Sequence, residues 1–348
     1  MRRGALRVGL IGAAGEARLL AEAYVRAEGI EPAGVADPDQ PDAAEALARA
    51  VGIGFEPNPE RLIGSGVGGI EICLGPGSAP EWIERSAKAH KPCRTLYPAA
   101  EELEPLIDAH RAALSAGVPA LLLYPPLHYA PLIKAKLLIQ DEALGDVQTM
   151  RMRTVLGGNG GWWGSEPPRF DRSRGTRLLN GHAFDMLPLA ALFIGPAERV
   201  FARLEPMDSA AACQLAWRYP GGRAHGVYEA INAPDTFFKS WHEPVSELFE
   251  LAGTDGYLWL RRLRGMGQDR PALETYIHTK VTSYGGKMPI GWDTAFDAAV
   301  SAFADAIGGK RRRGKAHSDL DLGFAERMLR MMDAFERAAE GNKPIDLD

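Results

Sequence analysis

The sequence predicts an α/β domain built on a doubly wound parallel sheet, followed by an α+β domain with a large, mostly antiparallel, open sheet. In residues 1–124, apolar runs alternate with amphipathic segments, whereas in residues 125–348 apolar runs follow one another across short turns. Alternation of this kind is typical of parallel sheets, and short turns join antiparallel strands. A chain of 348 residues is also longer than a single hydrophobic core usually accommodates. We therefore expect two domains, 1–124 and 125–348, with the option that the C-terminal helices pack back on the first.

Residues 6–39 are predicted to form a strand, a glycine turn, a helix and a second strand. The apolar run 8–11 stops at Gly12, an amphipathic segment follows, and the apolar run 33–36 ends on Asp37. In such a βαβ unit of the Rossmann type, the turn lets a dinucleotide pyrophosphate contact N–H groups at the helix N-terminus, and the acid closing the second strand binds the adenosine ribose. This segment therefore predicts a dinucleotide site.

The glycine pattern of the turn is imperfect. Read as GxGxxG/A it consists of Gly12, Ala14 and Ala17, so alanine replaces the glycine that lets phosphate approach most closely. Gly15 gives the turn room to shift. Asp37 favours NAD over NADP, because a carboxylate repels a 2′-phosphate and no arginine follows it directly. The alternative is a βαβ unit whose nucleotide site has decayed.

The rest of the first domain continues the alternation. Helices are expected at 42–51, 80–90 and 101–116, and strands at 70–74, 93–96 and 120–124. Ligands of doubly wound sheets bind outside the carboxyl ends of the strands. We therefore expect the cofactor to contact Gly12, Ala14, Gly15, Asp37, Gly75 and Pro76.

The second domain opens with a helix at 131–142, a strand at 147–155 and a glycine-rich loop of about two dozen residues that holds Trp162 and Trp163. Loops of that length inside compact domains are usually functional. A helix containing 181–185 follows. Strands are then expected at 200–204, 213–219, 225–231, 247–251 and 257–263, and helices at 294–307 and 319–339.

The composition is that of a globular protein and limits the classes of partner. The net charge of -5 argues against nucleic acid, and the basic run 310–313 is interpreted as a solvated loop. No stretch approaches a transmembrane span, and the start leads into a strand without a signal peptide, so we expect a cytoplasmic protein. Three scattered cysteines indicate reduced, structural thiols, and the histidines lack HxH or HExxH spacing, so no metal site is expected.

Nearly the whole chain resembles the GFO/IDH/MocA family of oxidoreductases, on six stretches in a fixed order. They are VGLIGAAG (8–15), VADPD (35–39), LGP (74–76), ALGDVQTMRMR (143–153), RFDRSRGTRLLNGHAFDMLPLAALFIGP (169–196) and ELAGTDGYLWL (250–260). The resemblance implies an N-terminal Rossmann domain that binds NAD and a C-terminal α+β domain with an open sheet. It also implies self-association through that sheet, as a homo-oligomer such as a dimer or tetramer.

Two family motifs are altered in this chain. The family's Glu-Lys-Pro, whose lysine exchanges a proton beside the nicotinamide, is here Leu96-Tyr97-Pro98. The family's Asp-x-Gly-x-His-x-x-Asp keeps His182 and Asp185, whereas its first aspartate is Leu178 and its glycine is Asn180. The resemblance therefore assigns Tyr97, His182 and Asp185 to catalysis, with an atypical group at the position of the lysine.

The pKa of a tyrosine side chain decides whether Tyr97 is expected to accept or to donate a proton. Burial raises the pKa of a phenol, so Tyr97 is a poor resting base unless a cation such as the oxidised nicotinamide offsets the desolvation. It is better suited to give a proton to an alkoxide formed during carbonyl reduction, with His182 binding the substrate oxygen or relaying the proton. The other interpretation is that Tyr97 only lines a pocket, and Asp185 either pairs with His182 or supports the helix start.

Four further residues are candidates for binding a small-molecule substrate: Trp162, Trp163, Tyr124 and His128. The two indole rings are suited to pack against a sugar or aromatic ring of the substrate, or alternatively pack on the sheet. The resulting prediction is an NAD-dependent oxidoreductase acting on a hydroxyl or carbonyl carbon of a sugar-like, cyclitol or hydroxylated substrate. Two alternatives stay open: a lyase or glycoside-cleaving enzyme that holds NAD, and a non-catalytic binding or regulatory member of the family.

Overall fold

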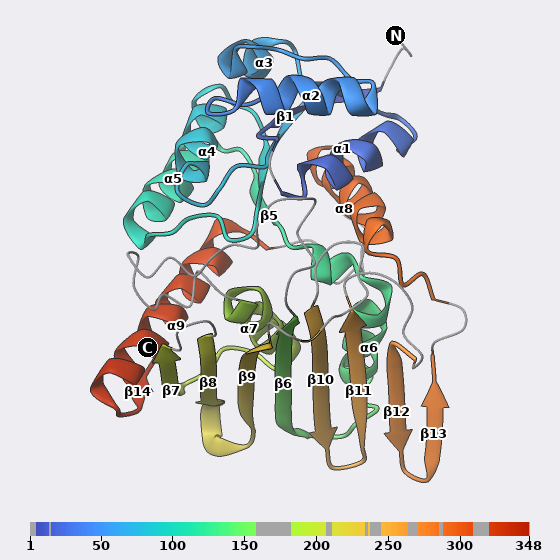
Figure 1. The fold of residues 1–348 in the computed structure, drawn as a ribbon, viewed down its shortest axis with the longest axis vertical. Coiled ribbons are helices and arrows are strands. Elements are labelled where there is room, and N and C mark those ends of the chain that lie inside the picture. The colour runs from blue at the N-terminus through green and yellow to red at the C-terminus, as the bar shows by residue number, and fades with distance from the viewer. Residues whose placement is uncertain are drawn as a thin grey trace. The chain divides into compact units, whose positions relative to one another are not determined.

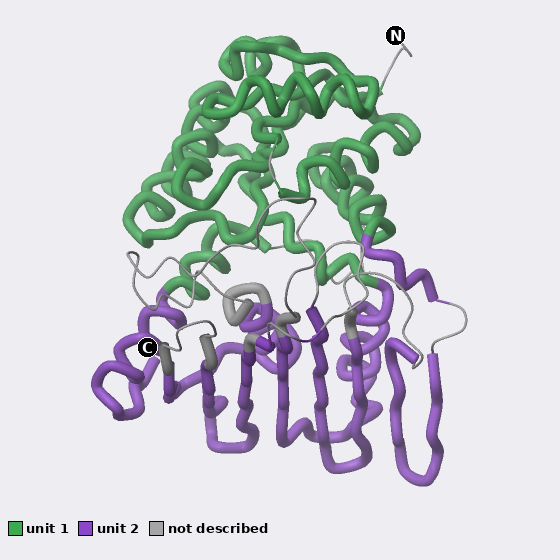
Figure 2. The backbone as a smooth tube through the Cα atoms, in the orientation of Figure 1, with its two compact units in different colours: residues 1–129, 293–329 green, residues 130–292, 330–348 purple. Residues whose placement is uncertain are grey.

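The computed structural model of the protein describes residues 5–13, 15–157, 182–206, 211–233, 236, 245–263, 271–284, 288–308 and 320–347. The chain divides into two units (Figure 2). Unit 1 consists of residues 1–129 and 293–329, and unit 2 consists of residues 130–292 and 330–348. Residues 293–329 therefore cluster with the N-terminal part of the chain, although they follow the second sheet in sequence.

Unit 1 is built on a parallel sheet with the strand order β2-β1-β3-β4-β5 (Figure 1). The strands are β1 (Leu6–Ile11), β2 (Ile30–Ala36), β3 (Gly69–Ile72), β4 (Cys93–Leu96) and β5 (Ala120–Leu123). All four residues of β3 are buried, as expected for a strand covered on both faces. The predicted doubly wound sheet is confirmed.

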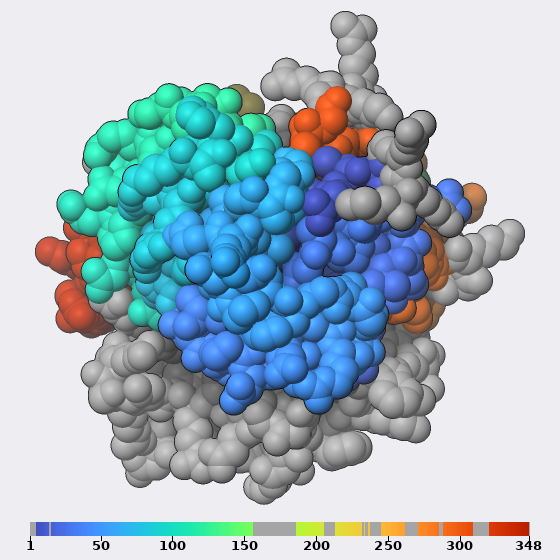
Figure 3. All heavy atoms as spheres, turned by 90° about the horizontal axis from the view of Figure 1, so that it is seen from above, coloured from blue at the N-terminus to red at the C-terminus, as the bar shows by residue number. Residues whose placement is uncertain are grey.

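Helices cover both sides of this sheet, with α1 and α8 on one side and α4 and α5 on the other (Figure 1). Their bounds are α1 (Ala17–Arg26), α2 (Pro41–Val51), α3 (Pro59–Gly64), α4 (Ala79–Lys88), α5 (Leu103–Ala116) and α8 (Trp292–Ile307). Proline in the first turn starts α2, α3 and α4, and a left-handed glycine ends α2 and α5. In the space-filling view, α2 and α3 (blue) lie beside α4 (cyan) on one face (Figure 3).

Unit 2 contains a sheet with the strand order β13-β12-β11-β10-β6-β9-β8-β7-β14. Its strands are β6 (Val147–Gly157), β7 (Arg199–Pro206), β8 (Ala211–Arg218), β9 (His225–Ala233), β10 (Val245–Gly253), β11 (Gly256–Leu263), β12 (Leu273–Ile277), β13 (Lys280–Ser283) and β14 (Ile345–Asp346). β6 runs parallel to β9, and the other pairs are antiparallel. The predicted mostly antiparallel sheet is confirmed.

The two faces of this second sheet differ. On β10, Val245, Phe249 and Leu251 are buried and alternate with half-buried residues, as in a strand with one covered face. The helices of unit 2 are α6 (Ala130–Gln140), α7 (His182–Phe193) and the C-terminal part of α9 (Leu322–Gly341). Tyr219 Oη donates a hydrogen bond to the Ala190 carbonyl of α7 at 3.2 Å, and the Trp217 ring packs edge-on against Phe335 of α9. We call this covered face the inner face and the opposite one the outer face.

Candidate functional site

The turn between β1 and α1 passes very close to the end of β3. Gly12 has a φ of +105°, and a Cβ at this position would lie 2.3 Å from the Cys73 carbonyl oxygen. The Gly12 N–H donates to the Ala36 carbonyl at 2.8 Å, so the turn is also joined to the end of β2. Only glycine fits both this backbone conformation and this approach, which explains the residue that ends the first apolar run.

The carboxylate of Asp37, at the end of β2, holds the turn in place. Its Oδ2 accepts the Ala13 N–H at 2.9 Å, and its Oδ1 accepts the N–H groups of Asp39 at 2.9 Å and Gln40 at 2.8 Å. Asp37 is only 4% exposed. The residue predicted as a ribose ligand therefore also links the glycine turn to the segment that leads into α2.

The remaining predicted cofactor residues border the same edge of the sheet. Gly75 is exposed, Pro76 is half-buried, and the Gly75 carbonyl accepts the Ala79 N–H at 3.0 Å where α4 begins. A Cβ at Gly15 or at Gly75 would meet nothing within 4 Å, so both positions adjoin open space. Ala14 lies outside the described residues. The carboxyl edge of the sheet therefore adjoins open space at Gly15 and Gly75.

Two predicted side chains of unit 1, those of Tyr97 and Tyr124, pack together farther along this edge. Tyr97 directly follows β4, its N–H donates to the Leu123 carbonyl at 2.9 Å, and its peptide bond to Pro98 is cis. The Tyr97 and Tyr124 rings pack edge to face with centroids 5.4 Å apart. His128 follows in a short 3₁₀ helix, η1 (Pro125–His128). Tyr97, Tyr124 and His128 are buried, at 6%, 2% and 9% exposure.

The other predicted site residues belong to unit 2. His182 and Asp185 lie on α7 (His182–Phe193), within the segment 181–185 that was predicted to belong to a helix. The predicted proximity of these two residues to Tyr97 stays a prediction. Trp162 and Trp163, like Leu178 and Asn180, lie outside the described residues.

Sequence reasoning missed a buried polar network in unit 1. Glu71 of β3 and Arg94 of β4 are 0% and 3% exposed, and Arg94 Nε donates to Glu71 Oε1 at 2.9 Å. Tyr24 Oη of α1 donates to the same oxygen at 2.6 Å, and Arg94 Nη1 donates to the Ala299 carbonyl of α8 at 2.6 Å. The available signal was a charged residue inside each of two short apolar strands, because such charges are buried only when paired.

The three cysteines are free thiols and are buried. Burial is the main cause that raises the pKa of Cys93 and of Cys213 to about 12. These groups stay protonated near neutral pH and make poor nucleophiles. Among the described residues, no group of three or more histidine, cysteine, aspartate and glutamate side chains could hold a metal ion. No helix in the described part of the chain has the length and apolar character needed to cross a membrane.

Solved structures match this chain over almost its full length, whereas no family model and no curated protein sequence matches it. An oxidoreductase from Agrobacterium radiobacter, in complex with NAD+, L-tartaric acid and magnesium, has a TM-score of 0.78 at 17% identity and covers 98% of each chain. A myo-inositol dehydrogenase from Corynebacterium glutamicum has a TM-score of 0.75 at 17% identity over 99% of each chain. An aldose-aldose oxidoreductase from Caulobacter crescentus, complexed with glycerol, has a TM-score of 0.76 at 18% identity, over 99% of this chain and 100% of that one.

The chain therefore has the two-part fold of NAD-binding oxidoreductases. Its neighbours include oxidoreductases and inositol dehydrogenases, as the resemblance to the GFO/IDH/MocA family implied.

The described residues fit an adenine dinucleotide. Gly12 brings the turn against β3, and α1 begins shortly after this turn, so that its N-terminus faces the place where such a fold receives a pyrophosphate. A carboxylate has about four acceptor sites, and three N–H groups occupy three of those of Asp37. One acceptor site of Asp37 therefore remains for a ribose hydroxyl.

Proposed function

We propose that the protein is an NAD(P)-dependent oxidoreductase that acts on a hydroxyl or carbonyl carbon of a small sugar-like, cyclitol or hydroxylated substrate. The observation that carries this proposal is the carboxyl edge of the unit 1 sheet. The glycine turn, fixed by Asp37, lies at the end of β1, and Tyr97 lies at the end of β4, with only β3 between these two strands. A dinucleotide bound at this edge would be held by the glycine turn and Asp37, with Tyr97 on the same edge.

NAD(P) supplies the hydride acceptor or donor. The chain's own groups handle the proton, and Tyr97 is the residue we assign to it. Its ring is buried and packs edge to face against the ring of Tyr124. Tyr97 Oη is proposed to donate a proton to a substrate oxygen as a carbonyl is reduced. His182, with Asp185 one turn away on α7, is proposed to bind that same oxygen.

Asp37 supports NAD as the preferred cofactor. Its carboxylate is fixed beside the turn by three N–H donors, so it cannot swing away to admit a second negative group. A 2′-phosphate brought to this position would be repelled. The substrate class is supported by the neighbours, since one acts on myo-inositol and another is named for aldoses.

The test has two stages. Calorimetric titration with NAD and with NADP should show binding of NAD and much weaker binding of NADP. A panel of polyols, aldoses and hydroxy acids is then screened for absorbance changes at the nicotinamide band. If neither nucleotide binds, the oxidoreductase proposal is wrong, and if NAD binds tightly without net reduction of any substrate, the NAD-holding lyase or glycoside-cleaving alternative gains support.

Tyr97→Phe tests the assigned proton donor. Loss of a general acid lowers the turnover number by about 100-fold or more. The dissociation constant for NAD should stay unchanged, because the hydroxyl contributes to proton transfer rather than to binding. Tyr284→Phe, which removes the same hydroxyl from another half-buried ring, is the matched control and should keep full activity. Equal turnover in both variants would show that Tyr97 only lines the pocket.

A further inference from the structure

The carboxylate of Asp37 connects two loops at the place where an adenosine diphosphate would bind. On one side is the glycine turn, because Asp37 Oδ2 accepts the N–H of Ala13, the residue directly after Gly12. On the other side is the start of α2, because Asp37 Oδ1 accepts the N–H groups of Asp39 and Gln40. A single side chain therefore holds the turn after β1 to the segment after β2.

The two oxygens of this carboxylate are not equally occupied. A carboxylate oxygen has about two acceptor sites. Among the described residues, two N–H groups fill the sites of Oδ1, whereas a single N–H group on Oδ2 leaves one site open. Asp37 is only 4% exposed, so little of its surface is left for a ligand. The open site thus belongs to the oxygen that already holds the turn, and a ribose that reaches it can engage one hydroxyl.

The bond to Ala13 extends the part of the turn that is fixed in place. Gly12 is fixed by its approach to the end of β3, where an added Cβ would lie 2.3 Å from the Cys73 carbonyl oxygen. Gly15, at the other end of the turn, has a φ of +57° and borders open space. Backbone N–H groups that are ordered before a ligand arrives bind it without a further loss of conformational entropy. Asp37 therefore contributes to the order of the turn on which a pyrophosphate would lie.

We infer that Asp37 is a positioning residue for the phosphates as well as a ligand of the ribose. Through Ala13 it sets how tightly the glycine turn binds the pyrophosphate. Through the open site on Oδ2 it receives the 2′-hydroxyl, which is the one that the acid of such a fold binds, and it makes no contact with the 3′-hydroxyl. This inference rests on the proposed function and adds to it the way in which the cofactor is recognised.

The first measurement uses the unchanged protein and three nucleotides: ADP, 2′-deoxy-ADP and 3′-deoxy-ADP. Calorimetric titration should give a dissociation constant about tenfold higher for 2′-deoxy-ADP than for ADP, because one hydrogen bond to a charged group is lost. The 3′-deoxy nucleotide should bind within about twofold of ADP. If both analogues bind about tenfold more weakly than ADP, if neither does, or if only the 3′-deoxy nucleotide does, the assignment of a single 2′-hydroxyl is wrong.

The second measurement uses the variant Asp37→Asn, in which an amide donor replaces one acceptor oxygen. Because 2′-deoxy-ADP lacks the hydroxyl that Asp37 would receive, a change in its affinity reports the turn. Its dissociation constant should rise about tenfold in the variant. Loss of the negative charge alone would act in the opposite direction, since a carboxylate repels phosphate. The matched control is Asp42→Asn, which removes the same charge from an exposed position in the first turn of α2 and should leave the affinity unchanged.

Circular dichroism confirms that both variants are folded, and kinetics separate positioning from a general loss of structure. In Asp37→Asn the Michaelis constant for NAD should rise while the turnover number at saturating NAD stays the same. If Asp37→Asn binds 2′-deoxy-ADP as tightly as the unchanged protein does, or more tightly, Asp37 acts on the ribose alone and the positioning role is wrong, while the proposed function stands. If the unchanged protein binds none of ADP, NAD and NADP, the inference and the proposed function fall together.

Discussion

At the scale of single residues, Gly12 shows that a site can depend on a residue without a side chain. Alanine at this position meets two obstacles: a φ of +105° that L-residues rarely adopt, and a carbonyl oxygen 2.3 Å from the new Cβ. The backbone conformation alone costs about 1–2 kcal/mol. Relieving the overlap adds about 1–3 kcal/mol, because the end of β3 has to move.

We therefore expect Gly12→Ala to lower the free energy of unfolding by about 3 kcal/mol and to abolish NAD binding. Urea denaturation and calorimetry measure the two effects. Gly15→Ala is the matched control, because Gly15 has a φ of +57° but a Cβ added there would meet nothing within 4 Å, so it should lose only about 1–2 kcal/mol. Equal losses in the two variants would mean that the contact with Cys73 does not matter.

Gly12 and Asp37 could be predicted from the sequence because each stands at the end of an apolar run, where chain geometry restricts the choice of residue. The hydrogen-bond partners of Asp37 could not be predicted from the sequence. Its bonds to Ala13, Asp39 and Gln40 depend on how two separate loops meet after the strands have paired. The sequence motif therefore identifies Asp37 as a site residue, and the folded turn shows which N–H groups it binds.

At the scale of elements, the Glu71–Arg94 pair joins two neighbouring strands to two helices. Arg94 contacts Glu71, the Ala299 carbonyl and the face of the Phe303 ring, 4.6 Å from its centroid. Tyr24 completes the network from α1. Breaking a buried pair by removing one partner costs far more than the pair contributes, because the other charge stays buried. The network thus fixes α1 and α8 on the same side of the sheet.

Replacing Arg94 by methionine should lower the free energy of unfolding at pH 8 by about 3–5 kcal/mol. Burial raises the pKa of the Glu71 carboxyl, and the charge of Arg94 opposes that shift, so the pKa rises further in the variant. When the pKa of a carboxyl is higher in the folded than in the unfolded protein, the free energy of unfolding falls as the pH rises above the unfolded pKa, which is about 4.3 for glutamate. The deficit relative to the unchanged protein should therefore be smaller at pH 5 than at pH 8, as urea denaturation at both values would show.

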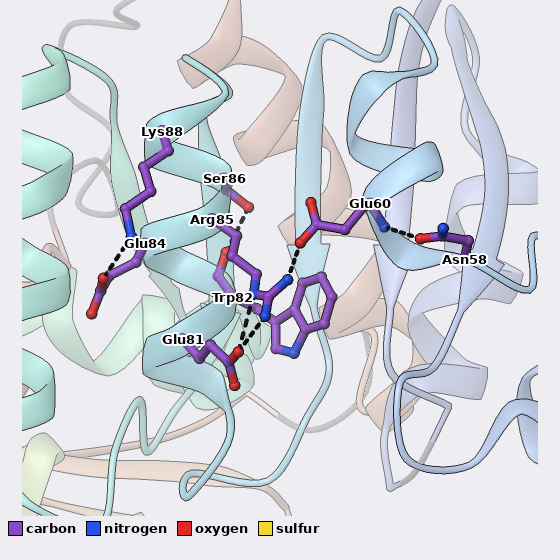
Figure 4. A network of polar contacts seen from close by, with 8 residues as sticks. All are labelled: Asn58, Glu60, Glu81, Trp82, Glu84, Arg85, Ser86 and Lys88. Atoms are coloured by element: carbon purple, nitrogen blue, oxygen red, sulfur yellow. Dashed lines mark hydrogen bonds and ion pairs between the residues drawn. The ribbon is translucent and has the colours of Figure 1, made fainter.

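Arg85 supplies the control for this prediction. It bridges α3 and α4 at the surface, pairing with Glu60 and with Glu81 while its guanidinium lies over the Trp82 ring (Figure 4). The side chains of Arg85 and Glu60 are 39% and 49% exposed, so solvent screens their charges. Arg85→Met should change stability by less than about 1 kcal/mol at either pH. A loss as large as that of Arg94→Met would contradict the role of burial.

Sequence analysis did not predict the short helix α3 or the strands β12, β13 and β14. These three strands lie at or next to the edges of the second sheet, and β13 is mostly exposed. Strands at a sheet edge bury little and carry weak alternation. The long strands β6, β8 and β9, which lie inside the sheet, were all predicted. Hydrophobic periodicity therefore predicts the centre of this sheet better than its rim.

At the scale of the whole molecule, an amphipathic pattern shows that a helix buries one face but not which sheet it covers. Residues 294–307 were predicted as a helix, and the structure places Ala299 and Phe303 of α8 against Arg94 of unit 1. No local feature of these residues indicates that partner. By contrast, the alternation of strands and helices was enough to predict the first sheet, and apolar runs joined by short turns were enough to predict the second.

The outer face of the unit 2 sheet carries the remaining whole-molecule proposal, self-association. Residues paired across adjacent strands point to the same face. The register thus places Phe201 of β7, Ile231 of β9 and Val281 of β13 on this face, as well as the Tyr257 and Tyr276 rings, which stack with centroids 5.2 Å apart. Phe201, Ile231 and Val281 are 37%, 46% and 62% exposed. Large apolar side chains exposed on one open sheet face are typical of an interface between subunits.

Ile231→Glu tests this proposal, because a carboxylate on the outer face would have to be buried unpaired in the interface. Light scattering should give the mass of a dimer or tetramer for the unchanged protein and a smaller mass for the variant. Leu114→Glu introduces the same charge at a residue of α5 that is 69% exposed and should leave the assembly intact. The proposal fails if the unchanged protein is a monomer, or if Ile231→Glu keeps its mass. Loss of assembly in the Leu114→Glu variant would instead indicate that the interface between subunits lies on unit 1.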